Sequence, residues 1–394
     1  WEQLIDTAIN RDVDAVVLTG DIVDAENKMY EAYGTLERGI RQLLTAGIDV
    51  VAVAGNHDYD TFPRLASAIE NENFHLLGYG GQWEAIQVES TRGVDIQFVG
   101  WSFPEAAVTA SPMDDFDVSL TDGPTVGVLH CDAGRSESKY APVGRDDLAR
   151  IDAAAWLLGH IHAPDRQLKE NQLQLYPGSL QPLDPGEGGE HGCWEISVSD
   201  TGAVESQFVP LASIRYDRAK IDVTGLGEAD VESEVLKTLR SELQDATEKW
   251  PELRHVAYRL VFEGRTQIHQ ALELQALDMV EQLQAEVDDA GATIEDYEMR
   301  TRPDHDLQAL ASGNDPTGVL AQLLIDLKAD EANASDIDAL LRETTKAVST
   351  VHESSRYEPL QRDSQTREAP EREDVKSLLL KQGYRMLDKL QAGT

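Results

Sequence analysis

Cysteine is nearly absent from this sequence. Its 394 residues include two cysteines, Cys131 and Cys193. Two thiols cannot build the disulfide framework of a small secreted protein, which indicates a reducing compartment. The sequence also has no apolar run long enough to span a membrane and no recognisable signal peptide. We therefore expect a cytoplasmic protein with no membrane partner.

Basic residues are also scarce. The chain has 34 Lys and Arg against 72 Asp and Glu, so its formal net charge is -38. This sign is wrong for a protein that binds nucleic acid at low salt. Either the surface is adapted to high salt, as in a halophilic protein, or the ligand is not a polyanion. We favour the first interpretation, because the acidic residues are spread along the whole chain.

The sequence does contain four short polar motifs, each placed directly after an apolar run. The runs have the length and composition of buried strands: 15–19, 50–54, 125–129 and 154–158. The residues that follow them are Gly20-Asp21, Gly55-Asn56-His57-Asp58, His130 and Gly159-His160-Ile161-His162. Strands that end in such side chains direct them toward one crevice. Any single motif would be explained by a turn or a buried histidine, but four in this order predict a metal site.

These motifs resemble those of the calcineurin-like metallophosphoesterases. That family has a further motif, Asp-x-His, on a strand about one helix upstream of Gly20-Asp21. The present chain begins inside that helix, at Trp1. We therefore expect the chain to lack its N-terminal strand and its first metal motif, and to be impaired as an enzyme in this form.

The resemblance implies two divalent metal ions, and it points to Mn. Asp21 would bridge the two ions, because a carboxylate offers two oxygens. Asn56, His130 and His160 would complete one metal site, and His162 would belong to the other. His57 would contact the scissile phosphate and protonate the leaving oxygen, while Asp58 would orient its imidazole. Oxygen and imidazole ligands together suit Mn, Fe or Zn better than Mg or Ca.

A second stretch narrows the resemblance to the DNA-repair exonucleases of the SbcD type, and within them to the YhaO-like branch. It comprises Tyr176–Gln181, Glu187 and His191-Gly192. The resemblance implies a DNA exonuclease and endonuclease that works with a coiled-coil, SMC-like ATPase and that can form a homodimer. Two positions depart from the family pattern: Asp24 stands where some members have a histidine, and His191 stands where lysine is common.

Two other functions stay open at this point. A small-molecule phosphodiesterase or phosphatase can be built on the same fold, because fold does not determine substrate. A scaffold subunit with an inactive site would also carry most of these motifs. The long region after the phosphoesterase motifs favours the nuclease over a small-molecule enzyme, which needs no such region.

The expected architecture is α/β. Residues 1–212 should form an αββα sandwich, with a hairpin over 84–101 that turns at Arg92-Gly93. Residues 213–266 should form a small α/β cap that binds DNA. Residues 267–394 should form a helical, partner-binding region with flexible linkers.

Within the helical region we expect helices at 268–290, 317–328 and 373–391, a linker at 300–316 and a flexible polar stretch at 352–372. The last helix has one apolar face, with Val375, Leu379, Tyr384 and Leu387 at spacings of three to five residues. This face would dock on the ATPase coiled coil, or it would pack against the chain's own domain.

Overall fold

The structure is a computed structural model that describes residues 1–23, 30–90, 94–135, 137–169, 171–329, 334–352 and 372–392. Contacts within the chain define two compact units. The first contains residues 1–220, 232–261 and 278–298, and the second contains residues 221–231, 262–277 and 299–394. None of the described helices combines the length and apolar character needed to span a bilayer.

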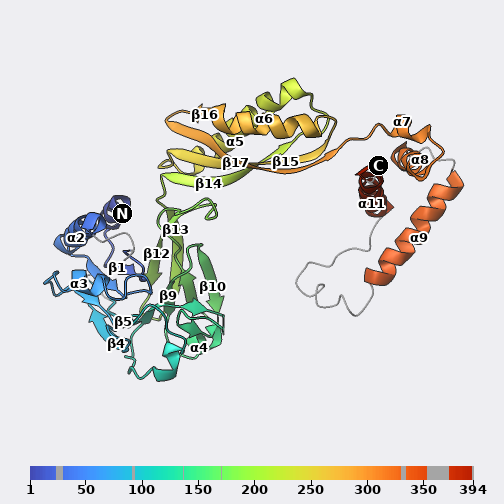
Figure 1. The fold of residues 1–394 in the computed structure, drawn as a ribbon. Helices are drawn as coiled ribbons and strands as arrows, with labels where there is room; N and C mark the ends of the chain where they lie inside the picture. Colours follow the sequence, from blue (N-terminus) through green and yellow to red (C-terminus); the bar gives the residue numbers. More distant parts are fainter. Residues whose placement is uncertain are drawn as a thin grey trace. The chain divides into compact units, whose positions relative to one another are not determined.

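The N-terminal part begins with a parallel sheet of three strands in the order β1-β2-β3. Figure 1 shows α2 beside this sheet. The elements are α1 (Glu2–Asn10), β1 (Ala15–Leu18), α2 (Tyr30–Thr45), β2 (Asp49–Ala52), α3 (Phe62–Ala66) and β3 (Phe74–Leu76). Because β1 and β2 are parallel, their carboxyl ends lie at the same edge of the sheet.

A second, mixed sheet has six strands in the order β10-β11-β9-β6-β5-β4. Its strands are β4 (Glu84–Val88), β5 (Ile96–Trp101), β6 (Thr125–His130), β9 (Ala155–Gly159), β10 (Asp165–Lys169) and β11 (Gln172–Tyr176). Every residue of β6 and β9 is buried, which explains why most of their residues are apolar. The predicted hairpin is confirmed as β4 and β5, while its predicted turn lies outside the described residues.

Alternate residues of β2 show how the layers stack. Val50 and Ala52 pack with residues of α1 and α2, whereas Val51 and the following Val53, just after the strand, pack with residues of the six-stranded sheet. Successive side chains of a strand point to opposite faces, so β2 lies between a helical layer and the second sheet. A third cluster, which includes Trp156, covers the other face of the second sheet. The expected two-sheet α/β sandwich is therefore confirmed.

Smaller elements complete this part of the chain. They are the 3-10 helix η2 (Pro112–Asp115), β7 (Asp132–Ala133), β8 (Pro142–Val143), α4 (Arg145–Ala149), β12 (Gly192–Val198) and β13 (Val204–Pro210). The strands β12 and β13 form an antiparallel hairpin.

The next segment forms a four-stranded sheet in the order β14-β15-β17-β16. Its elements are β14 (Ile214–Asp222), the 3-10 helix η3 (Glu228–Asp230), α5 (Val231–Lys249), β15 (His255–Thr266), α6 (His269–Gln282), β16 (Gln284–Val287) and β17 (Ala290–Pro303). Helix α5 buries Val235, Leu239 and Leu243, which recur every four residues and therefore share one face.

Two predictions for this segment are wrong. The helix expected at 268–290 ends at Gln282, and the linker expected at 300–316 contains the end of β17 and a helix. The cause is a hairpin that pairs Val287 with Ala290. Its two-residue turn places Asp288 at a φ of 50°, a left-handed value that tight hairpin turns require. In the sequence, the acidic residues of this turn fit the pattern of exposed positions on a helix, which is why the helix was expected to continue to residue 290.

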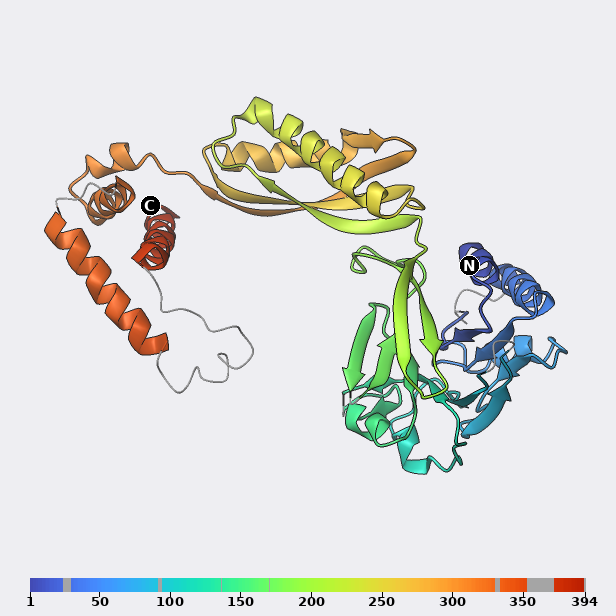
Figure 2. The same ribbon diagram turned by 180° about the vertical axis from the view of Figure 1, so that it is seen from behind.

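The C-terminal helices are α7 (Leu307–Ala311), α8 (Pro316–Ala329), α9 (Ala334–His352) and α11 (Arg372–Ala392). The helices expected at 317–328 and 373–391 are confirmed as α8 and α11. Helix α11 packs against both α8 and α9 (Figure 2). Val375, Tyr384 and Leu387 are buried in these contacts, so the apolar face of α11 packs within its own chain. Most of the stretch predicted to be flexible, 353–371, lies outside the described residues.

Asp388 of α11 is the centre of a charged cluster in the second unit. Its carboxylate accepts hydrogen bonds from Arg265 at 2.9 and 3.1 Å and from His305 at 2.8 Å. The guanidinium of Arg265 also lies 4.0 Å from the ring centre of Tyr384. Burial alone would raise the pKa of Asp388, but the hydrogen bonds from Arg265 and His305 outweigh it and lower the pKa. These contacts hold α11 to the end of β15.

Candidate metal centre

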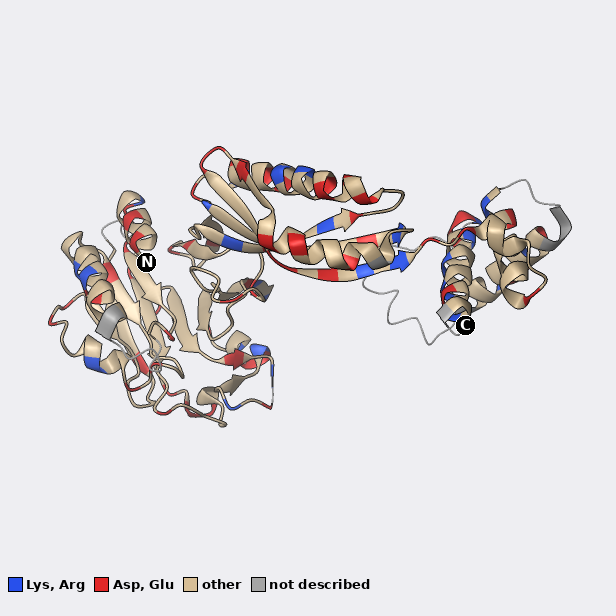
Figure 3. Cartoon of the chain, turned by 45° about the horizontal axis from the view of Figure 1, so that its top comes forward, with Lys and Arg blue, Asp and Glu red and all other residues tan. Residues whose placement is uncertain are grey.

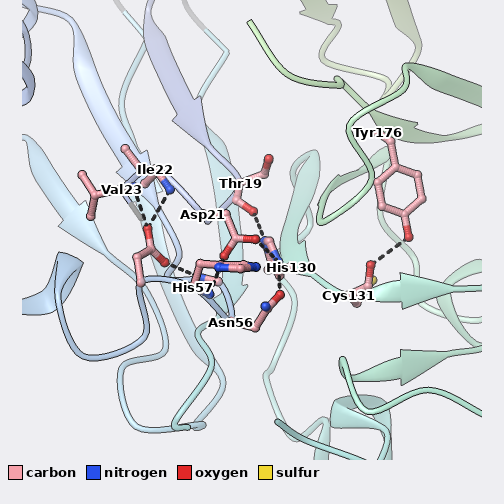
Figure 4. A network of polar contacts seen from close by, with 11 residues as sticks. Thr19, Asp21, Ile22, Val23, Asn56, His57, His130, Cys131 and Tyr176 are labelled. Atoms are coloured by element: carbon pink, nitrogen blue, oxygen red, sulfur yellow. Dashed lines mark hydrogen bonds and ion pairs between the residues drawn. The ribbon is translucent and has the colours of Figure 1, made fainter. Parts of the chain in front are cut away.

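The four motifs lie at the carboxyl ends of four strands. Asp21 follows β1, Asn56 and His57 follow β2, His130 ends β6, and His160 follows β9. Figure 4 shows Asp21, Asn56, His57 and His130 pointing toward one another. One ligand atom each from Asp21, His130 and His160 lies within 4.8 Å of the other two. Both sheets therefore contribute side chains to one site.

His130 is the buried centre of this site, with no exposed surface. Its Nδ1 atom donates a hydrogen bond to the carbonyl oxygen of Thr19 at 2.9 Å. In a neutral imidazole the other nitrogen, Nε2, then carries a lone pair. It faces Oδ1 of Asn56 at 3.0 Å and Oδ2 of Asp21 at 3.2 Å.

This arrangement fits a metal cation. Three acceptor atoms converge, and a carboxylate, an amide oxygen and an imidazole nitrogen repel one another unless something positive lies between them. His160 brings a second imidazole to the group. Such a set of oxygen and imidazole donors suits Mn, Fe or Zn. The residues present are therefore suited to hold a divalent transition metal.

The backbone at two of these residues is strained. Asp21 has a φ of 52° and His160 has a φ of 101°, values that residues other than glycine rarely adopt. Such strain persists where the surrounding structure holds it, and it often marks a functional site. Here it turns both side chains from the ends of their strands toward His130.

Glycines allow the strands to approach His130 closely. A Cβ atom on Gly159 would lie 1.8 Å from the carbonyl oxygen of Thr19, and one on Gly55 would lie 2.3 Å from Oδ1 of Asp21. No side chain fits at these distances. The Gly-His-x-His and Gly-Asn-His sequences therefore have a steric reason, which is to let β1, β2 and β9 meet around one imidazole.

The surroundings of Asp21 and His160 shift the pKa values of both side chains downward. Burial alone would raise the pKa of Asp21, but its contact with the imidazole of His130 and the hydrogen bond from the His57 N–H outweigh burial and lower the pKa. Burial lowers the pKa of His160. A deprotonated carboxylate and a neutral imidazole are the forms that bind metal.

Asp58 lies under the site and is completely buried. Its carboxylate accepts hydrogen bonds from the backbone N–H groups of Ile22 at 2.7 Å, Val23 at 3.4 Å and Gly55 at 2.6 Å. It therefore ties the turn after β1 to the turn after β2. Burial raises the pKa of Asp58 to about 6, although these hydrogen bonds favour the ionised form.

His57 lies beside Asp21. Its backbone N–H donates to Oδ1 of Asp21 at 2.8 Å, and the residue is exposed. The backbone position of His57 is thus coupled to Asp21. The predicted orienting contact from Asp58 to the imidazole of His57 stays a prediction.

His162 stands apart from the cluster of Asp21, His130 and His160. Its Nδ1 atom donates to Oε1 of Glu187 at 2.5 Å, and its side chain is 47% exposed. It lines the same cavity as Asp21 and His160, which has a volume of about 820 Å³. Its predicted role at the other metal site stays a prediction.

Two residues near the site had no predicted role, although Glu187 belongs to the stretch that resembles the SbcD-type exonucleases. Glu187 contacts His162, and burial alone would raise its pKa, but hydrogen bonds from the Leu183 N–H and from His162 lower it. The ring of Tyr140 lies 4.8 Å from that of His160. Both residues come from loops, where no periodic sequence pattern marks a position that faces a site.

Comparisons with known proteins agree with this geometry. The calcineurin-like phosphoesterase superfamily domain matches residues 2–198, and the middle domain of the metallophosphoesterase YhaO matches residues 216–302. The chain is 29% identical over 225 residues to the uncharacterized metallophosphoesterase YhaO of Bacillus subtilis, covering 56% of this chain and 54% of that protein.

Two nuclease-related proteins are also similar. The DNA double-strand break repair protein Mre11 of Haloferax volcanii is 26% identical, and the match covers 90% of this chain and 74% of that protein. A subunit of the nuclease SbcCD of Bacillus subtilis is 28% identical, covering 45% of this chain and 54% of that protein. The chain thus spans about half the length of YhaO and of the SbcCD subunit. Because the superfamily match extends over half of the chain and contains all four motifs, this protein belongs to the calcineurin-like phosphoesterase superfamily.

Proposed function

We propose that this phosphoesterase is a Mn-dependent DNA nuclease of the repair type, which hydrolyses phosphodiester bonds as an exonuclease and endonuclease. The observation that carries the proposal is the close approach of oxygen atoms from Asp21 and Asn56 to Nε2 of His130. The similarity to a DNA-repair protein and to a nuclease subunit supports DNA as the substrate.

Asp21 is proposed to bridge two cations, with Asn56, His130 and His160 completing one site and His162 joining the other. Bound there, two divalent cations supply Lewis acidity that neutralises phosphate charge and makes a water molecule more acidic. Asp58 holds the two turns that carry Asp21 and Asn56 in register, through its three backbone hydrogen bonds.

His57 is the proposed general acid. Its backbone hydrogen bond to Asp21 places it next to the metal ligands, while its exposure leaves the imidazole accessible to substrate. In its protonated form the imidazole can bind the scissile phosphate and then give its proton to the leaving oxygen.

The acidic surface affects the salt concentration at which DNA can bind. A net charge of -38 repels a polyanion at low salt. We propose that the protein works at high ionic strength, where the Debye length falls to about 3 Å at 1 M salt and this repulsion is screened.

The test of this function uses the full-length protein, purified metal-free and supplied with Mn. Release of nucleotides from end-labelled duplex DNA is compared with hydrolysis of bis-p-nitrophenyl phosphate, at low and at molar KCl. Mn-dependent DNA cleavage that Asp21→Asn abolishes supports the proposal. Activity on the small ester alone would indicate a small-molecule phosphodiesterase, and inactivity on both substrates would indicate a scaffold.

We also propose a coiled-coil, SMC-like ATPase as partner. The SbcCD relative is named as one subunit of a larger nuclease, which supports this part of the proposal. The face of α11 formed by Val375, Tyr384 and Leu387 is occupied by α8 and α9, so docking must use other residues. Exposed apolar candidates are Leu378 and Met386 of α11, which are 38% and 59% exposed and lie about two turns apart.

The ATPase encoded beside this gene, where one is present, is the partner to test. Leu378→Asp combined with Met386→Asp should abolish co-purification with it and leave the melting temperature unchanged. The matched control is Lys381→Asp with Lys389→Asp on the same helix. If both double variants co-purify with the ATPase as well as the wild-type protein does, docking through Leu378 and Met386 is contradicted.

A further inference from the structure

The carboxylate of Glu187 is held in place from two directions. Oε1 accepts the hydrogen bond from Nδ1 of His162, and Oε2 accepts one from the backbone N–H of Leu183 at 2.9 Å. The hydroxyl of Ser179 lies 3.4 Å from Oε2. A carboxylate with both oxygens engaged has little freedom to rotate, so it presents a fixed acceptor to His162.

The loop that carries Glu187, residues 178–191, is itself closed on His162. The backbone N–H of Ser179 donates to the carbonyl oxygen of His162 at 2.9 Å. His191, the last residue of the loop, is 2% exposed and contacts residues earlier in the loop. Its Nε2 donates to the carbonyl oxygen of Glu187 at 3.1 Å, and its Nδ1 lies 2.9 Å from Oγ of Ser179.

The same loop is anchored outside the phosphoesterase sheets. The backbone N–H of Gly189 donates to the carbonyl oxygen of Tyr216 at 3.1 Å, and Nε2 of Gln181 donates to that of Ile214 at 2.7 Å. Glu190 also pairs with Lys249 of α5 at 2.9 Å, but this ion pair lies on the surface and adds little to stability. The loop is therefore supported on one side by β14, and on the other side it contacts His162.

We propose that Glu187 is the positioning residue of His162, and that the 178–191 loop holds the Glu187 carboxylate against the imidazole. A carboxylate accepts but cannot donate, so it fixes the proton on Nδ1 and leaves Nε2 of His162 as the lone-pair nitrogen. Carboxylates in this position orient metal-binding histidines and select their tautomer. The inference rests on the proposed function, in which His162 is a metal ligand.

The first test needs no metal. Long-range ¹H–¹⁵N correlation spectra of the metal-free protein report which imidazole nitrogen of His162 carries the proton. We expect the Nδ1–H form in the wild type and in Glu190→Gln, and a mixture of both forms in Glu187→Ala. A wild-type His162 protonated on Nε2, or a tautomer that Glu187→Ala leaves unchanged, would overturn the inference.

The second test measures Mn affinity by calorimetry with the full-length protein. Glu187→Ala and the milder Glu187→Gln should weaken the site that His162 serves by about 10- to 100-fold. Glu190→Gln, on the same loop, should have no effect. Glu187→Asp should recover part of the loss, because it keeps a carboxylate. In a His162→Ala background, Glu187→Ala should have no further effect.

The outcomes separate the two proposals. A wild type that binds no Mn contradicts the proposed function, while the tautomer experiment still decides the role of Glu187. Equal Mn affinity in Glu187→Ala and the wild type, with His162→Ala weaker, contradicts the inference and leaves the function standing. Melting temperatures identify any variant that fails to fold. If Glu187→Ala fails to fold, the Mn affinity of Glu187→Gln tests the inference in its place.

Discussion

Asp21 and His57 lie next to each other, yet they are expected to act differently. The carboxylate of Asp21 contacts both the backbone of His57 and the Nε2 atom of His130. The hydrogen bond between His57 and Asp21 uses the backbone N–H of His57, so it survives a change of the His57 side chain. A substitution of Asp21 should therefore affect metal binding, whereas a substitution of the His57 side chain should affect proton transfer.

We predict that Asp21→Asn weakens Mn binding by about 100-fold or more, because a neutral amide replaces the charged ligand. His57→Gln should leave Mn affinity within a factor of about three and lower the cleavage rate by about 10²- to 10⁴-fold, the usual contribution of a general acid. Calorimetry and a nuclease assay on the same samples measure both. If the two variants lose metal equally, His57 is a ligand and the assigned roles are wrong.

A second prediction at the residue scale concerns Glu242 of α5. This half-buried side chain faces Asp217, Asp245, Arg215 and Tyr258. Burial, together with the nearby charge of Asp217, raises the pKa of Glu242 from 4.5 to about 7. An acid whose pKa is raised on folding stabilises the protein fully below its unfolded pKa, and this stabilisation is lost as the pH rises through the folded pKa.

Glu242→Gln should therefore raise the melting temperature at pH 8 and change it little at pH 4.5. The gain should be about 1 kcal/mol, since water screens part of the cost at a half-buried site. Thermal unfolding at both pH values measures the effect. Glu248→Gln, an exposed position on the same helix, is the control. A gain of equal size at both pH values would show that the pKa of Glu242 is not raised.

Among the elements, the contact between β1 and β9 decides the geometry of the candidate metal centre. The carbonyl oxygen of Thr19, just after β1, accepts from His130, and the backbone of Gly159, at the end of β9, lies against it. The missing side chain of Gly159 is what allows this contact. The centre thus depends on two strands that belong to different sheets.

We predict that Gly159→Ala destabilises the protein by about 1–3 kcal/mol, because the new methyl group must displace Thr19. The hydrogen bond from His130 to Thr19 should break, so Mn affinity should fall as well. Gly34→Ala makes the same change inside α2, where the new Cβ atom comes no closer than 3.7 Å to another atom. That control should stabilise the protein by about 0.5–1 kcal/mol. Thermal unfolding should therefore give opposite signs, and a stable Gly159→Ala protein would contradict the close contact.

At the scale of the whole molecule, the excess of acidic residues is the dominant feature. Figure 3 shows Asp and Glu on the helices, strands and loops alike rather than in one patch. Charge of one sign spread in this way destabilises the compact state through its own repulsion. Salt that screens this repulsion should favour folding.

We predict that the melting temperature rises as KCl is increased from low to molar concentration, because the net charge of -38 is then screened. Sucrose at matched osmolality is the control, since it stabilises folded proteins without screening charge. A melting curve that stays flat or falls with KCl, relative to sucrose, would favour a substrate that is not a polyanion.

The sequence by itself determined the strands that lead into Asp21, Asn56, His130 and His160, and the class of chemistry that they support. Each of these motifs is local, because a buried strand followed by a glycine turn places its polar residue within a few positions. The helices at 317–328 and 373–391 were also predictable, since apolar periodicity is a local property.

Only the tertiary structure decided what these residues contact. Asp58 bonds to the backbone of Ile22 and Val23, and His162 bonds to Glu187, which lies 25 residues further along the chain. The apolar face of α11 packs on α8 and α9, although the same pattern would suit a partner. Each outcome depends on side chains far apart in sequence, whose contacts form only when the whole chain packs, so no local pattern could distinguish them.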